Sequence, residues 1–409
     1  MAVSRRFFFA SSAAALASPA LIRLARGDAP VRLKLHHAMS SVSCAHTDFL
    51  VPWARNIEAQ ANGGIHIDIF PSMELGGQPR DLFDQARYGA ADIVWAMPSE
   101  TPGRFPRIET FELPFVPSAR ALVSSKAVED FSADLLRDEF REVHPLCFSC
   151  SDRGILHAAG PIESLAGIRG RRFDVRTRFA VAAVEALGGR ALIMPSGQLS
   201  LAVTRNLVDG AIVPWDMVPA LKLDQVLKAH TDFPDYALST TTYMLVMNKA
   251  AYTKLPAELK KVIDDNSGQP AASMAGAMWD RKAKAVADAV SAGGETIVTV
   301  APEDAAAWRK ATQPVLDVWV KEMAMRKLGG EKLLANARSL LAKYAAEPEP
   351  PPPQLSQSSQ PATTPDSPPQ PQAPQPKAPN PSQPTASKST APAPPAPAAP
   401  AAPTLNIPL

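Results

Sequence analysis

Two cysteines separated by two residues are the first feature of this chain that could support covalent chemistry. Cys147 and Cys150 have the spacing of a thiol–disulfide redox pair. Such a pair needs its first thiol at a helix N-terminus, where the dipole lowers the thiol pKa. The surrounding residues, HPLCFSC, instead resemble a β-strand, in which positions i and i+3 point to opposite faces. The pattern therefore favours a strained or absent disulfide over a redox site, and two cysteines alone make a poor zinc site.

Charged side chains on a second stretch could instead bind a carboxylate. Residues 170–176 read GRRFDVR, and strand alternation places Arg172, Asp174 and Arg176 on one face. A guanidinium binds a carboxylate through two parallel N–H donors. Asp174 would repel such a ligand unless a cation pairs with it. Arg176 is therefore a candidate ligand residue, and a surface or packing role for these charges is the alternative.

No motif assembles a catalytic set. The chain contains no H-E-x-x-H, no G-x-S-x-G, no Gly-rich phosphate loop and no Cys-His pair with supporting context. We therefore expect a protein that is not an enzyme and that uses no cofactor or metal. An exported thiol enzyme using Cys147 and Cys150 is a remote alternative.

Alternating strand and helix patterns position the candidate residues. Strands are predicted at 31–35, 65–69, 91–95, 146–156, 172–176, 191–194, 211–213 and 243–248. Helices are predicted at 45–61, 82–88, 121–141, 179–187, 198–207, from 255, 266–291, 302–328 and 331–344. Such repetition predicts parallel sheets flanked by helices.

Two such units imply a two-lobed α/β fold. Chain crossings are expected near Cys150 and Asp235, with a hinge and an interlobe cleft. The expected first lobe is 28–152 plus 238–280, and the second is 153–237 plus 281–346. Ligands of open α/β sheets bind at the carboxyl ends of strands. Trp95 and Ser99, at the end of the third strand, are therefore candidates for the first-lobe wall.

The N-terminal residues predict export. Residues 1–27 contain SRRFFF and an Ala- and Leu-rich run, which indicates a twin-arginine signal peptide cleaved before Asp28. An uncleaved amphipathic tail is the alternative. Removal of this segment lowers the Lys+Arg count from 42 to 38 against 40 Asp+Glu, a net charge of −2. A near-neutral chain gives no electrostatic case for nucleic acid or a lipid surface.

The C-terminal residues have a different composition. Residues 347–409 consist mainly of Pro, Ala, Gln, Ser and Thr, with almost no charge. Such a segment cannot bury enough apolar surface to fold, and Pro-rich tracts favour extended conformations. We expect a disordered tail, either a tether or an extension without a role.

Short motifs follow one another in a characteristic order between residues 31 and 344. They are FPSMELGG at 70–77, FELPF at 111–115, GRRFD at 170–174, ALGG at 186–189, MP at 194–195, LVDG at 207–210, and MNK at 247–249 followed by LP at 255–256. The ordered set resembles the DctP-like periplasmic solute-binding proteins of TRAP transporters. The resemblance implies a receptor that captures a small organic acid, usually a carboxylate. It also implies delivery of that acid to membrane subunits of a transporter driven by an ion gradient.

The resemblance also implies where the ligand binds. The family's key arginine position reads Asp174, so the expected guanidinium is at Arg176 or at Arg178 in the adjacent Thr-Arg pair. Arg153 lies near a second family arginine, beside the first crossing. Trp215 lies in a loop that contributes to the family's pocket, and a tryptophan there favours a ring-bearing acid.

Two further residues are weaker candidates. His37 ends the first strand, and Tyr243 begins the last one. Packing is the alternative role for both. Asp174 and the unusual tail also motivate a second functional hypothesis, in which an envelope scaffold or sensor of the same fold has lost transport and uses the tail to bind a partner.

Overall fold

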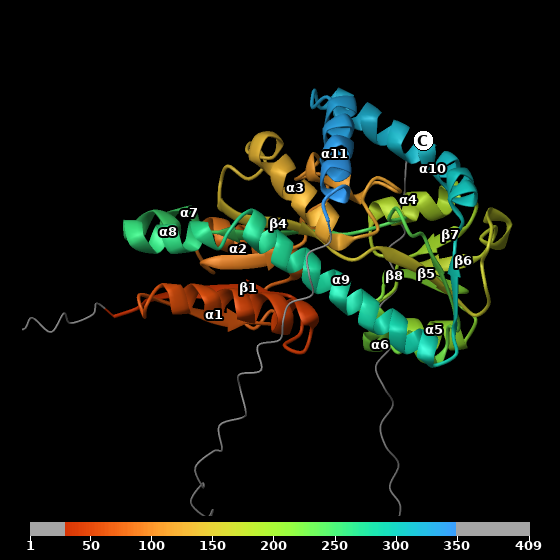
Figure 1. Ribbon diagram of the computed structural model, residues 1–409, viewed down its shortest axis with the longest axis horizontal. Helices are drawn as coiled ribbons and strands as arrows, with labels where there is room; N and C mark the ends of the chain where they lie inside the picture. The colour runs from red at the N-terminus through yellow and green to blue at the C-terminus, as the bar shows by residue number, and fades with distance from the viewer. Residues whose placement is uncertain (1–28, 349–409) are drawn as a thin grey trace, which may run out of the picture. The chain divides into compact units, whose positions relative to one another are not determined.

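A computed structural model describes residues 29–348 of the protein. It shows two β-sheets around which the protein is built (Figure 1). The first sheet has the strand order β2-β1-β3-β10-β4, and the second has the order β11-β9-β5-β8-β6-β7. Helices pack against both sheets. The predicted two-lobed α/β fold is therefore confirmed, whereas the predicted signal peptide and nearly all of the predicted tail lie outside the described residues.

The strands lie close to the predicted positions, with two additional strands and one predicted strand divided in two. The prediction of parallel sheets is wrong for β10 and β5, which are antiparallel to their neighbours. β9 and β11, which were not predicted, are short and contain three threonines and a histidine among their residues, AHTD and TIVT. The predicted strand at 146–156 is two strands that belong to different sheets. The strands are β1 (Val31–His37), β2 (Ile65–Phe70), β3 (Ile93–Ala96), β4 (His144–Cys150), β5 (Gly154–Ala158), β6 (Arg172–Asp174), β7 (Arg190–Leu192), β8 (Gly210–Pro214), β9 (Ala229–Asp232), β10 (Thr242–Met247) and β11 (Thr296–Thr299).

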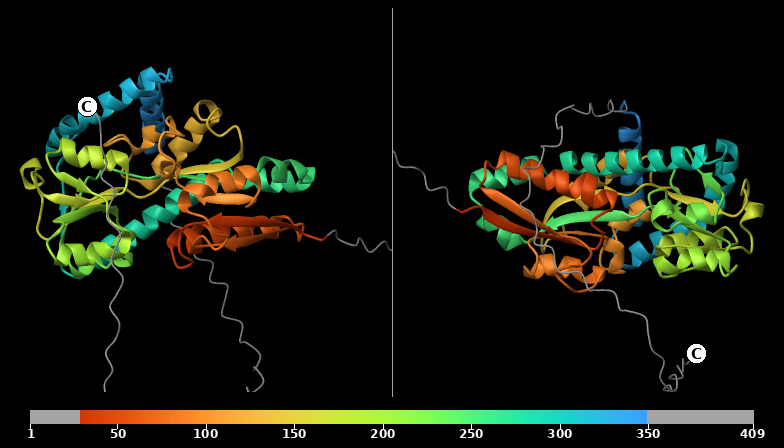
Figure 2. Two further views of the ribbon diagram at one scale, coloured as in Figure 1. Left: turned by 180° about the vertical axis from the view of Figure 1, so that it is seen from behind. Right: turned by 90° about the horizontal axis from the view of Figure 1, so that it is seen from below.

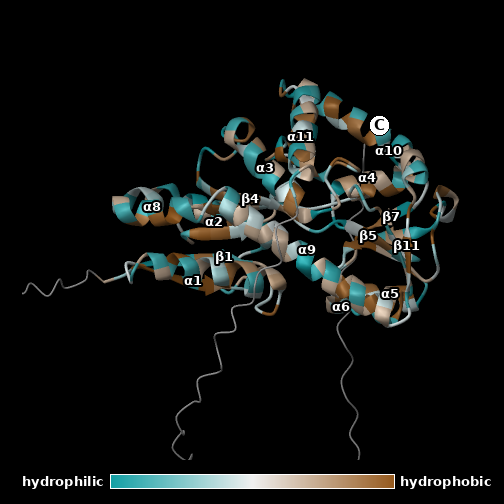
Figure 3. Ribbon diagram, in the orientation of Figure 1, coloured by the Kyte–Doolittle hydropathy of each residue, from teal (hydrophilic) through white to brown (hydrophobic). Residues whose placement is uncertain are grey.

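The helices carry apolar residues on the faces that meet the sheets, and Figure 3 shows the resulting bands of polar and apolar residues along them. No described helix is both long enough and apolar enough to cross a membrane. The α-helices are α1 (Val51–Gln60), α2 (Leu82–Tyr88), α3 (Ala121–Leu135), α4 (Arg178–Ala186), α5 (Leu199–Thr204), α6 (Met217–Ala220), α7 (Lys249–Lys254), α8 (Ala257–Asp265), α9 (Gln269–Ala292), α10 (Pro302–Met325) and α11 (Gly330–Ala345).

The chain passes between the sheets three times, twice through loop segments and once through α9, which leads from β10 of the first sheet to β11 of the second. β4 of the first sheet is followed after residues 151–153 by β5 of the second sheet, and β9 of the second sheet is followed by β10 of the first. β10 lies between β3 and β4 and is antiparallel to both. The first sheet is therefore completed by a strand that returns from the second.

Helix α9 packs against both sheets. Its first half, including Ala275 and Trp279, belongs to the apolar core of the first sheet, whereas Val286 and Val290 belong to a core of the second. Figures 1 and 2 show α9 extending from one sheet to the other. The long helix predicted at 266–291 is thus confirmed as α9, and it spans both lobes.

The lobe boundaries stay a prediction. Helices α10 and α11 matter for them because of the sheets against which these helices pack. Trp308 of α10 packs with the core of the second sheet, whereas Trp319 and Met323 pack with the first. α11 packs on α3 beside the first sheet. The sequence places 281–346 in the second lobe, and the packing shows that α10 and α11 also contact the core of the first sheet.

A glycine allows α9 to approach α3 closely. A Cβ atom on Gly276 would lie 2.6 Å from the Leu122 Cα and 2.9 Å from the Ala121 oxygen. Real Cβ atoms do not make such contacts, and backbone atoms cannot move aside as a flexible side chain can. The absence of a side chain at Gly276 is therefore a packing requirement.

We predict that Gly276→Ala lowers the free energy of unfolding by about 1–3 kcal/mol, although alanine is normally the better helix former. Gly160→Ala is the control, because a Cβ there would meet no atom within 4 Å, and it should change stability by less than about 0.5 kcal/mol. Urea denaturation measures both. Equal stability of the two variants would contradict the packing argument.

Candidate functional site

The candidate residues of the first sheet lie together at one edge. β1 and β3 are parallel, and their register pairs His37 with Trp95 at the carboxyl ends of both strands. Tyr243 near the start of β10 stacks on Trp95, with ring centroids 4.8 Å apart and an interplanar angle of 12°. Ser99 follows in the short turn Pro98–Glu100. The carboxyl edge of the first sheet thus brings together four of the predicted residues.

Three candidate residues lie at the corresponding edge of the second sheet. β6 and β8 are parallel, Arg176 lies two residues beyond β6, and Trp215 directly follows β8. β5 is antiparallel to β8, with Gly154 opposite Pro214. Arg153, which precedes β5, therefore lies at this edge as well.

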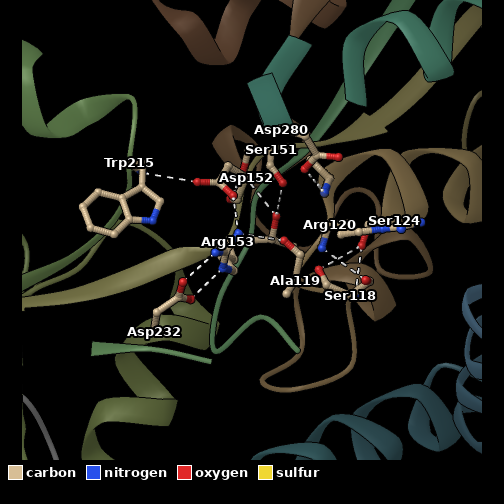
Figure 4. Close-up of polar contacts among 12 residues, drawn as sticks. Ser118, Ala119, Arg120, Ser124, Ser151, Asp152, Arg153, Trp215, Asp232 and Asp280 are labelled. Atoms are coloured by element: carbon tan, nitrogen blue, oxygen red, sulfur yellow. Dashed lines mark hydrogen bonds and ion pairs between the residues drawn. The ribbon is translucent and has the colours of Figure 1, made fainter. Parts of the chain in front are cut away.

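The two edges lie next to each other. Both crossing segments leave from them, and Asp152 in the first crossing accepts a hydrogen bond from the Trp215 backbone N–H, at 3.3 Å (Figure 4). The charge of Asp216, next to Trp215, also contributes to raising the pKa of Tyr243 in the first sheet, after the larger effect of burial. Adjacent carboxyl edges of two sheets are where hinged α/β proteins bind ligands.

Arg153 is held by acceptors of the protein itself (Figure 4). It donates to both carboxylate oxygens of Asp232, each at 2.6 Å, and to the Ala119 carbonyl oxygen at 3.1 Å. It also donates to Asp152, which is fully buried, at 3.3 Å. Burial disfavours its charge, but the bond to Asp232 and the charge of Asp152 more than offset this and raise the Arg153 pKa. Arg153 therefore ties the crossing segment to its neighbours on both sides.

Arg178 is engaged in ion pairs that join distant elements. From the first turn of α4 it contacts Glu109 in the turn Ile108–Glu112 and Glu322 on α10, the latter at 3.2 Å. Burial raises the Glu109 pKa, and Arg178 opposes that rise. The structure thus does not group Arg178 with Arg153, Arg176 and Trp215.

Arg176 is the cation that Asp174 requires. The Arg176 Nη2 lies 2.6 Å from the Asp174 Oδ2, and its Nη1 donates to the Met194 carbonyl oxygen at 2.9 Å. Asp174 also accepts from the Met194 N–H at 2.9 Å. Burial raises the Asp174 pKa, and the Arg176 charge counteracts it. The negative charge of Asp174 is thereby compensated by a residue two positions further along the chain.

A buried histidine pair supports Trp215. His157 Nδ1 lies 2.7 Å from His230 Nδ1, and His157 Nε2 lies 3.1 Å from the Val213 oxygen. Both rings pack against Trp215, with centroids 5.4 Å and 5.1 Å from its ring. Burial lowers the His157 pKa to about 3. A neutral His157 thus packs against the ring of Trp215.

Sequence reasoning missed several residues of this region. Burial raises the pKa of Asp152 to about 8 and that of Asp216 to about 6. Trp279 on α9 extends the aromatic stack, with its ring centroid 5.8 Å from that of Tyr243. The two aspartates could have been found from the sequence, because Asp152 precedes Arg153 and Asp216 follows Trp215. Nothing in the Ala-rich sequence of α9 indicated a role for Trp279.

The cysteines lack the environment of catalytic thiols. Cys147 and Cys150 lie on β4, as predicted, and both are free and fully buried. Burial raises the pKa of each thiol well above its ordinary value, whereas a nucleophilic cysteine needs a lowered pKa. This environment opposes the thiol-enzyme hypothesis.

Glu112 connects the motif FELPF to the start of β10. Its Oε1 accepts hydrogen bonds from the Thr242 N–H at 3.0 Å and from the Thr242 hydroxyl at 2.6 Å. Burial raises the Glu112 pKa from 4.5 to about 7, although these bonds favour the ionised form. Between those pH values the folded chain retains a proton that the unfolded chain releases. This group therefore lowers stability as pH rises.

We predict that Glu112→Gln, which keeps the acceptor but cannot ionise, becomes more stable relative to the parent by roughly 2 kcal/mol between pH 5 and pH 7.5. Urea denaturation at several pH values measures this difference. Glu258→Gln on the exposed start of α8 is the control and should show no comparable trend. A difference between Glu112→Gln and parent that is constant with pH would contradict the predicted titration.

Comparison with known proteins identifies the family. The model of the bacterial extracellular solute-binding protein family 7 matches residues 35–323. A TRAP solute-binding protein from Rhodoferax ferrireducens, solved with copurified benzoate, is 33% identical, with a TM-score of 0.71 and coverage of 77% of this chain and 98% of that chain.

Two further relatives agree. A marine metagenome TRAP solute-binding protein specific for aromatic acid ligands, solved with 3-hydroxybenzoate, is 34% identical, with a TM-score of 0.72 and coverage of 78% and 99%. The C4-dicarboxylate-binding periplasmic protein DctP of Shewanella loihica is 22% identical over 296 residues, which are 70% of this chain and 84% of that protein. The family resemblance found in the sequence is confirmed: this chain belongs to the bacterial extracellular solute-binding protein family 7, a family of receptors and not a class of enzymes.

Proposed function

We propose that this protein is the periplasmic receptor of a TRAP-type transporter and that it binds a small aromatic carboxylic acid between the carboxyl edges of its two sheets. The observation that carries the aromatic class is the stack of Trp95, Tyr243 and Trp279 at the edge of the first sheet, with Trp215 at the edge of the second. Aromatic rings favour a planar, ring-bearing ligand. The aromatic acids bound by the two relatives that are 33% and 34% identical support the same class.

Arg176 is the proposed partner of the ligand carboxylate. It lies at the carboxyl edge of the second sheet, and its pairing with Asp174 compensates the charge that would otherwise repel an acid. A guanidinium has five N–H donors, so it can contact more than one acceptor. His37, Ser99 and Tyr243 are the proposed contacts on the first-sheet side. Arg153 and Arg178, which the sequence also suggested, would act by positioning the crossing segment and α4.

Delivery and export complete the proposal. The receptor would reach the periplasm through the twin-arginine route and would deliver its acid to the membrane subunits of the transporter. Neither step involves a covalent change in the ligand.

We predict that aromatic carboxylic acids raise the melting temperature of the purified protein and that C4-dicarboxylates do not. A ligand at 100 times its Kd should stabilise the folded state by ~2.7 kcal/mol. A thermal-shift screen across benzoates, phenylacetates and dicarboxylates measures this. A response confined to dicarboxylates would refute the aromatic class, and no response to any organic acid would favour the scaffold hypothesis.

We predict that Arg176→Met weakens binding of an aromatic carboxylate about 30-fold or more, because a charge-assisted hydrogen bond contributes ~2 kcal/mol. The control is Arg172→Met at the start of β6, where the guanidinium pairs with Asp209 at 2.9 Å near the opposite edge of the sheet. It should leave the Kd within about threefold of the parent. Isothermal titration calorimetry measures both, and unchanged affinity of Arg176→Met would exclude it as the anchor.

A further inference from the structure

We infer that the bound acid carries a hydrogen-bond donor on its ring, a hydroxyl or an amino group, and that Asp216 is the residue that accepts from it and selects for it. This inference rests on the proposed function, because it concerns the far end of the same aromatic ligand.

Asp216 is held in place by its neighbours. It follows Trp215, whose N–H donates to buried Asp152 and whose carbonyl oxygen accepts from the Val218 N–H at 3.1 Å. The Trp215 ring packs against two buried histidines. Because the backbone on both sides is fixed by hydrogen bonds and packing, the Asp216 carboxylate occupies a defined position at the edge of the second sheet.

The carboxylate of Asp216 lacks a full set of partners. Its Oδ1 is buried and, within residues 29–348, has no hydrogen-bond partner. Its side chain also forms no capping bond at the start of α6, although aspartate commonly caps a helix from this position. Buried carboxylate oxygens are normally matched by donors, so an unmatched one indicates that a donor arrives from elsewhere.

Within residues 29–348 no donor reaches Oδ1, although the backbone N–H groups of Asp216 and Met217 act on the carboxylate and lower its pKa. Lys282 on α9 is the nearby cation whose charge acts on Asp216, but the part of the chain that the structure describes contains no ion pair between them. On the first-sheet side, Asp216 is close enough to Tyr243 and Cys44 to raise the pKa of each, after the effect of burial. Asp216 follows Trp215 at the edge of the second sheet, and its charge acts on Tyr243, a member of the aromatic stack beside which the ring of the ligand is proposed to bind.

The charges at this edge set the direction of the ligand. A ligand carboxylate would be repelled by Asp216 and attracted by Arg176, and these residues follow the neighbouring parallel strands β8 and β6. The end of the ring away from the carboxylate then faces an acceptor. A hydroxyl or amino group there makes a charge-assisted hydrogen bond, whereas an unsubstituted ring leaves the acceptor unpaired. Sites of this kind reject analogues that lack the donor.

The test is a ligand series on the parent protein. Titration calorimetry compares benzoate with its hydroxy and amino isomers, and each hydroxy isomer with its methoxy counterpart. We expect at least one hydroxy or amino isomer to bind about tenfold or more tightly than benzoate, and its methoxy counterpart, which cannot donate, to lose that gain. Equal affinity of benzoate and every donor-bearing isomer would overturn the inference.

Variants assign the selection to Asp216. Asp216→Ala, which removes both acceptor oxygens, should bring the ratio between the preferred isomer and benzoate to within about threefold while benzoate still binds, and Asp288→Asn, on the exposed last turns of α9, should keep the parent ratio. Asp216→Asn, which keeps one acceptor oxygen but loses the charge, should lower the ratio and makes the comparison if the first variant does not fold. A ratio that survives both substitutions would place the acceptor elsewhere and overturn the assignment.

If the parent binds no ring-bearing acid, the proposed function fails as well, and the missing response to benzoate distinguishes that result from the failure of Asp216 alone.

Discussion

The arrangement of the site depends on one buried ion-pair network at the crossing between the sheets. Asp152 is fully buried and accepts from Arg153 and from the Trp215 backbone, while Arg153 also holds Asp232 at the end of β9. A buried carboxylate without such partners would be costly. The hydrogen bonds and ion pairs of Asp152 and Arg153 therefore fix three segments relative to one another: the turn between β4 and β5, the end of β9 and the loop after β8. Those segments carry Arg153, Trp215 and Asp216, and Arg176 follows β6, the strand that pairs with β8.

Sequence periodicity was sufficient for most of the elements and for the edges at which they end. Trp95 and Ser99 could be placed because one lies at the end of a strand and the other follows it, and parallel strands bring their carboxyl ends together. The motif LVDG was recognisable, and packing explains its glycine: a Cβ on Gly210 would lie 2.3 Å from the His157 oxygen and 2.8 Å from the Phe173 ring. Local composition could not reveal β9, because AHTD lacks the apolar run that marks a buried strand.

The partners of the arginines could not be predicted from the sequence. Arg153 pairs with Asp232 and Arg178 with Glu109, residues that are 79 and 69 positions away. A guanidinium offers the same chemistry to a ligand and to a protein carboxylate. The choice between them is therefore made by tertiary contacts. Burial of Asp152 and Asp216, which raises their pKa, is likewise a property of the assembled fold.

Asp174, where the family resemblance predicts an arginine, has its charge matched by a neighbour. Asp174 at the end of β6 and Arg176 two residues further on neutralise each other, and Asp152 and Asp232 together hold Arg153. These groups compensate most of the charge at the edge of the second sheet. Asp216, whose Oδ1 has no hydrogen-bond partner among the described residues, remains as an acceptor. A ligand that fits such an edge must offer a negative group to Arg176 and a donor to Asp216, because a ligand with acids at both ends would place one of them against an aspartate. The charge pattern thus argues for a monocarboxylic acid with a polar donor over a dicarboxylic acid.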